Sequence, residues 1–154
     1  MDSLSDIAYE YFVEFETEKS CPHHFEGDPS ILLFFQSWAF SVQFGGQHDL
    51  AKIAFHLKQS LKINLSPLLK FADRNVENTF DARELQQSWQ SPDELMQCTT
   101  QIIYALEHPD GSLSSLLTEE YELLLPRLQD LHKMCTWAVQ EKCLIRMSFD
   151  TVNV

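Results

Sequence analysis

ILLFFQSWAFSVQF, residues 31–44, is the stretch on which the predicted fold depends. On a helical wheel of about 100° per residue, its apolar side chains form two stripes on nearly opposite sides. One stripe contains Ile31, Phe35, Trp38 and Val42, and the other contains Leu33, Phe40 and Phe44. A helix with two apolar sides must be covered on both, so we expect residues 31–44 to form the central helix of the domain.

Amphipathic segments on both sides of this stretch predict the helices that cover it. Apolar residues recur at intervals of three and four over residues 4–19, 49–62, 66–80, 91–107 and 118–143. The strongest start signal is Ser91-Pro92-Asp93-Glu94, which combines a capping residue, a proline and two acids that the helix dipole favours. The sequence therefore predicts an all-α fold, in which residues 1–154 form a single-domain bundle of about six helices around the central apolar helix (31–44).

The C-terminal part of the chain adds three expectations. Pro126 interrupts the predicted 118–143 helix, and the hydrogen bond that it removes predicts a kink near Leu125. Apolar residues of the same helix form a heptad-like seam, which could serve a homodimer as well as a contact within the chain. Residues 147–154 are β-prone and short, so we expect a disordered or extended tail.

The charge and the cysteines limit the partners and the compartment. Against 23 Asp and Glu stand 11 Lys and Arg, a formal net charge of −12. This charge repels nucleic acid and anionic membrane surfaces, so we expect neither as a partner. Residues 31–44 are also too short and too polar for a membrane span of about 20 residues. The four cysteines form no CxxC pair and the acidic start lacks the features of a secretory signal, so we expect a cytoplasmic protein with reduced thiols.

One loop concentrates reactive side chains. Cys21-Pro-His-His-Phe-Glu-Gly-Asp28 holds a thiol, two imidazoles and two carboxylates, which makes Cys21, His23, His24 and Asp28 candidate metal ligands. An imidazolium beside a thiol can also lower the pKa of the thiol and generate a nucleophile. The second ligand pair of a common zinc site is missing, however, and a polar loop that happens to contain histidine explains the segment as well. The glycine-rich loop of a nucleotide site is missing too, and we expect no cofactor.

Surplus aromatic residues and acidic stripes point to a binding surface. Phe55 lies away from the apolar stripe of its predicted helix, Phe80 ends a helix, and Trp89 lies in a polar connection. Exposed aromatic side chains are enriched at binding surfaces, although each could pack under a neighbouring loop. Glu10 and Glu14 lie on the predicted solvent side of the 4–19 helix, where they could attract a basic partner.

These observations favour a small, acidic, helical protein that acts by binding another protein, as an adaptor, regulator, chaperone-like or immunity-type module. A basic surface on that partner would complement the acids, and the aromatic residues would anchor it. Two alternatives remain. One is a metal-dependent or thiol enzyme that uses the Cys21, His23, His24 and Asp28 loop. The other is a protein that binds an apolar small ligand beside the central helix.

Overall fold

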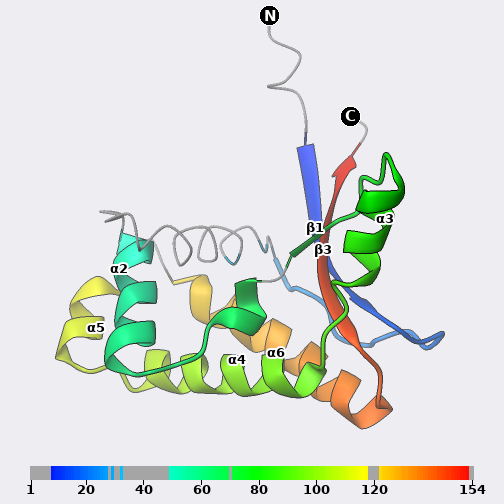
Figure 1. Ribbon diagram of the computed structural model, residues 1–154. Helices are drawn as coiled ribbons and strands as arrows, with labels where there is room; N and C mark the ends of the chain where they lie inside the picture. Colours follow the sequence, from blue (N-terminus) through cyan, green and yellow to red (C-terminus); the bar gives the residue numbers. More distant parts are fainter. Residues whose placement is uncertain are drawn as a thin grey trace, which may run out of the picture.

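The computed structural model describes residues 8–27, 29, 32, 49–69, 71–117 and 122–152, shown in colour in Figure 1. The predicted central helix therefore lies outside the described residues, apart from the buried Leu32. The elements, in chain order, are β1 (Ala8–Phe15), α2 (Asp49–Phe55), the π-helical η3 (His56–Ser60), the 3₁₀-helical η4 (Ser66–Leu69), β2 (Phe71–Asp73), α3 (Thr79–Gln86), α4 (Pro92–Glu107), α5 (Gly111–Leu116), α6 (Leu124–Glu141) and β3 (Ile145–Val152).

The all-α prediction is wrong, because the described residues contain a three-stranded mixed sheet. The strand order is β1-β3-β2, with β1 antiparallel and β2 parallel to β3. The segment AYEYFVEF also fits a helical spacing, yet its side chains alternate and it contains four aromatic residues and the β-branched Val13. Pairing with β3 at the other end of the chain favours the strand. The expected tail is also corrected, since residues 147–152 belong to the central strand.

Two predicted helices differ from the observed elements in their bounds. Residues 66–80 contain η4, then β2, and then the start of α3, whose first turn is capped by Asn78 Oδ1 accepting from the N–H of Asp81 at 2.9 Å. The predicted 118–143 helix is described from Leu124 onwards as α6. Pro126 therefore lies in the first turn of a helix, where its missing N–H breaks no intrahelical bond, and the kink expected near Leu125 is replaced by a helix start.

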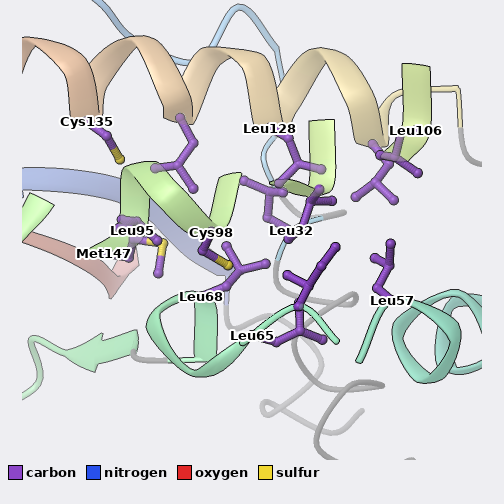
Figure 2. Close-up of a cluster of buried hydrophobic side chains, with 14 of the residues drawn as sticks. Leu32, Leu57, Leu65, Leu68, Leu95, Cys98, Leu106, Leu128, Cys135 and Met147 are labelled. Atoms are coloured by element: carbon purple, nitrogen blue, oxygen red, sulfur yellow. The ribbon is translucent and has the colours of Figure 1, made fainter. Parts of the chain in front are cut away.

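The helix predicted over residues 91–107 is confirmed by α4. Ser91 Oγ accepts from the N–H of Asp93 at 3.3 Å, and Pro92 occupies the first turn. Buried leucine and cysteine side chains of α4 face those of α6 and of the segment that contains η3 and η4 (Figure 2). This contact forms the main core. Among the described residues, no helix combines the length and the apolar composition needed to cross a lipid bilayer.

The two faces of β3 have different neighbours. Ile145 and Met147 point into the core cluster that α4 and α6 share, so Arg146 and Ser148 point to the opposite face of the sheet. The guanidinium of Arg146 donates from Nη1 to the carbonyl of Leu85 in α3 at 2.8 Å. Helix α3 therefore stands beside the sheet, away from the helical core (Figure 1).

Candidate protein-binding surface

Helix α3 and the loop before it expose apolar side chains. No residue of this helix is buried, and the ring of Phe80 in its first turn is 65% exposed. Val76, two residues before the capping Asn78, is 41% exposed. A helix is normally held to a domain by an apolar stripe, so the large exposed ring of Phe80 needs another explanation.

An acidic hollow lies between the end of β2 and α3. Its volume is about 370 Å³, and four carboxylate-bearing residues line it: Asp73, Glu77, Asp81 and Glu84. Phe80 does not line the hollow itself, but it lies one helical turn before Glu84 on the same side of α3, next to residues that do. We call this region, formed by Val76, Phe80 and the four acids, the α3 surface.

Local hydrogen bonds hold two of these carboxylates in place. Asp73 Oδ1 accepts from the N–H of Asn75 at 2.9 Å, and Asp81 Oδ2 accepts from the N–H of Glu77 at 3.1 Å. Arg74, the cation next to Asp73, is paired with Glu14 of β1. The hollow therefore keeps a concentration of negative charge next to an exposed aromatic ring.

Glu14 was predicted to belong to a solvated, partner-binding stripe, and the structure corrects this. Its side chain is only 18% exposed, and Oε1 accepts from Arg146 at Nε (3.1 Å) and Nη2 (2.9 Å) and from Ser148 Oγ (2.6 Å). Oε2 pairs with Arg74. The register of β1 and β3 puts Glu14 opposite Arg146, so its acid is used inside the fold.

Trp89 is also partly used within the fold. The guanidinium of Arg146 lies 4.1 Å from the centroid of its ring, a cation–π contact, and the residue is half-buried. Together with Glu14, Trp89 therefore fixes the arginine whose bond to Leu85 holds the end of α3. Glu14 and Trp89 therefore stabilise the α3 surface indirectly, through Arg146.

The remaining predicted partner-binding residues are exposed but lie apart. Phe55 is 51% exposed on α2, at the opposite end of the molecule from α3 (Figure 1). Glu10 is exposed on β1. Phe55 and Phe80 are thus exposed and do not pack under a neighbouring loop, the alternative that the sequence left open, and their role in binding stays a prediction.

The predicted metal ligands lie on the loop after β1. Cys21 is half-buried, His23 and His24 are exposed, and Asp28 lies outside the described residues. Within the part of the chain that the structure describes, no three His, Cys, Asp or Glu side chains gather as metal ligands would. Burial raises the pKa of the Cys21 thiol, although the N–H of His23 opposes this by donating to Sγ at 3.4 Å. The thiol is therefore protonated near neutral pH.

The buried cysteines provide a test of the core. Burial raises the pKa of Cys98 from 9.0 to about 12, and it raises that of Cys135 as well. At pH 8 the thiolate fraction of Cys98 should be about a thousandfold below that of a thiol with pKa 9. We expect iodoacetamide to modify the half-buried Cys21 first and Cys98 only after unfolding, as followed by peptide mass spectrometry. Equal rates at Cys21 and Cys98 in the folded protein would contradict this burial.

The same shift predicts a loss of stability in alkali. The folded pKa of Cys98 lies above its unfolded value, so the unfolded chain loses this proton first as the pH rises. The contribution of the protonated Cys98 thiol to the free energy of unfolding is fully present below pH 9 and decreases between about pH 9 and about pH 12.

Part of the exposed surface is not evident from the sequence. Val76 and the hollow were not predicted, because Asp73 and Glu84 come together only when β2 pairs with β3 and α3 folds back beside it. Tyr104 was missed as well, although a signal exists. It lies nearly opposite the apolar stripe of α4 on a helical wheel, and its exposed ring stacks on His108 with centroids 4.5 Å apart.

Comparison with known proteins adds no relative: no protein-family model, no curated protein and no solved structure matches this chain.

Proposed function

We propose that this protein acts by binding a basic segment of another protein at the α3 surface. The observation that carries the proposal is the position of the exposed Phe80 ring beside a hollow lined by four carboxylates. Aromatic anchors contribute a large share of the binding free energy at protein interfaces. Acidic groups around such an anchor accelerate the association with a partner of opposite charge.

The charge of the whole chain supports the same class of partner. A formal net charge of −12 attracts basic surfaces and repels phosphate-rich ones at long range. The four cysteines are free thiols, as is usual in a reducing compartment, and we place this binding in the cytoplasm.

Replacement of Phe80 by serine is expected to abolish partner capture without unfolding the protein. The ring contributes little to the core because it is 65% exposed, so the change in stability should stay within about 0.5 kcal/mol. We would immobilise the protein, apply an extract of the cells that produce it, and identify the captured proteins by mass spectrometry at low and high salt. The purified partner would then be titrated against each variant.

The matched control is Phe55→Ser, which removes a similarly exposed ring at the other end of the molecule. We expect wild type and Phe55→Ser to capture the same basic protein and Phe80→Ser to lose it. Glu77→Gln and Glu84→Gln together should weaken the capture and its dependence on salt. Capture that survives Phe80→Ser, or no capture at either salt concentration, would contradict the proposal.

A further inference from the structure

A second feature of the fold is the outer edge of β1. In the described part of the sheet β1 is an edge strand, paired with β3 alone. Ile145 of β3 exchanges both of its backbone hydrogen bonds with Gln90, at 2.9 and 3.0 Å, so its partner Phe15 is not in a hydrogen-bonded pair. The N–H of the next residue, Glu16, does point to β3 and donates to Leu144 at 3.0 Å.

The alternation of an antiparallel ladder extends this assignment along β1. Val13 lies two residues from Phe15, so its N–H and C=O also point away from β3. The carbonyl of Phe149, opposite Tyr11, accepts from Arg74 on the β2 side at 3.0 Å, as the same alternation requires. Val13 therefore presents a backbone donor and a backbone acceptor at the outer edge of the sheet.

A groove of about 930 Å³ follows this edge. Its lining includes six consecutive residues of β1, 10–15, and residues of the loop 19–27 on the other side. Neighbouring side chains of a strand point to opposite faces, so a hollow that touches six in succession runs along the backbone and not over one face. Its size lies at the upper end of the range of small-molecule pockets, and six residues of strand extend about 20 Å.

The two sides of the groove differ in chemistry. Val13 and Phe15 lie on the core side of the sheet, where Phe25 of the loop also packs against the core. Glu10 lies on the other side of the sheet, in the same alternating set as Glu14. Glu16 and Glu18 are exposed just beyond β1, while Lys19 is paired with Glu141 at 2.6 Å. The groove is therefore apolar on its core side, whereas its other side combines the ring of Phe12 with the carboxylate of Glu10, because Arg74 and Arg146 neutralise Glu14.

We propose that this groove binds an extended segment of a partner protein, with alternating apolar and basic residues, as a fourth strand beside β1. Backbone hydrogen bonds to Val13 would supply affinity, and the alternation would place apolar side chains on the core side and a basic side chain near Glu10. The edge carries neither the proline nor the lysine with which proteins commonly protect such strands. This inference does not depend on the α3 surface, which lies on a different element.

The probe is a fluorescein-labelled peptide of four Lys-Val repeats, titrated with the full chain and followed by anisotropy. A peptide of equal charge, with four lysines followed by four valines, measures attraction that needs no alternation. A third peptide carries N-methyl groups on alternate amides and cannot form the ladder. We expect the alternating peptide to bind at least about tenfold more tightly than either control. Hydrogen exchange should show protection of the Val13 amide by this peptide alone.

On the protein side, the variant is Val13→Pro, which removes the outward N–H and leaves the ladder to β3 intact. Val13→Pro should weaken the binding of the alternating peptide by at least about tenfold, whereas Phe80→Ser should leave this binding unchanged. If Val13→Pro fails to fold, the comparison of the alternating peptide with its N-methylated form still tests whether backbone hydrogen bonds carry the binding. Equal binding of all three peptides, no binding of the alternating one, or its loss in Phe80→Ser would overturn the proposal.

Discussion

Replacing Glu14 by alanine is expected to lower the free energy of unfolding by about 3–5 kcal/mol. Arg146 is only 7% exposed, and the carboxylate of Glu14 is its counter-charge, accepting from both Nε and Nη2. Without Glu14, the buried guanidinium keeps the carbonyl of Leu85 and the ring of Trp89. Neither compensates a full positive charge in a site with little water.

Thermal unfolding followed by circular dichroism would measure this loss as a decrease in Tm of roughly 6–20 °C. Glu10→Ala, four residues earlier on the same strand, is the matched control and should stay within about 0.5 kcal/mol because Glu10 is exposed. Glu14→Gln keeps an acceptor but removes the charge, and its effect should fall between the two. A loss below about 1 kcal/mol for Glu14→Ala would show that the network does not hold β1 and β3 together.

Replacing Asp130 by alanine is expected to produce a loss of similar size, about 3–5 kcal/mol, where α6 contacts the loop after β1. Asp130 of α6 is 7% exposed, lies 3.2 Å from Nε of Arg127 and accepts from the N–H of Glu26 at 3.0 Å. The variant leaves the guanidinium of Arg127 buried without its partner. It also releases the loop that forms one side of the β1 groove.

Two measurements separate these consequences. Denaturant unfolding reports the global loss, and hydrogen exchange of residues 20–27 reports the release of the loop. A Cβ at Gly27 would lie 2.3 Å from Nη1 of Arg127, the end of a flexible side chain, so Gly27→Ala should shift this guanidinium and release the loop less than Asp130→Ala. Glu107→Ala, on the exposed side of α4, serves as the control. Unchanged exchange in Asp130→Ala would contradict the role of Asp130 as the anchor of the loop.

Some residues of the candidate sites are grouped by local sequence, and others are brought together only by the tertiary structure. Phe80, Glu77 and Asp81 lie within a few residues of one another, so their grouping follows from local sequence once a helix starts at Thr79. Asp73 and Arg74 reach this region only because β2 pairs with β3. The β1 groove depends on tertiary structure entirely, since it is a property of a sheet edge.

Glu14 shows most plainly what the sequence pattern cannot predict. Its spacing from Glu10 fits a helical stripe, and the same residues alternate as a strand requires. The choice between the two is made by Arg146, which is 132 residues away in the sequence. A pattern of three and four over one short segment carries no information about that partner.

The sequence by itself determined the acidic character of the chain, the capped start of α4, and the position of Phe55 away from the apolar stripe of its helix. These properties depend on composition or on residues within one helical turn, where a cap or a side chain meets neighbours close in the chain. Only the tertiary structure decided that the two ends of the chain form a sheet, that Glu14 is an internal counter-charge, that Phe55 and Phe80 are exposed, and that β1 is an edge strand in the described part of the sheet. Strand pairing joins backbone groups of distant segments, and its free energy is gained only when those segments meet.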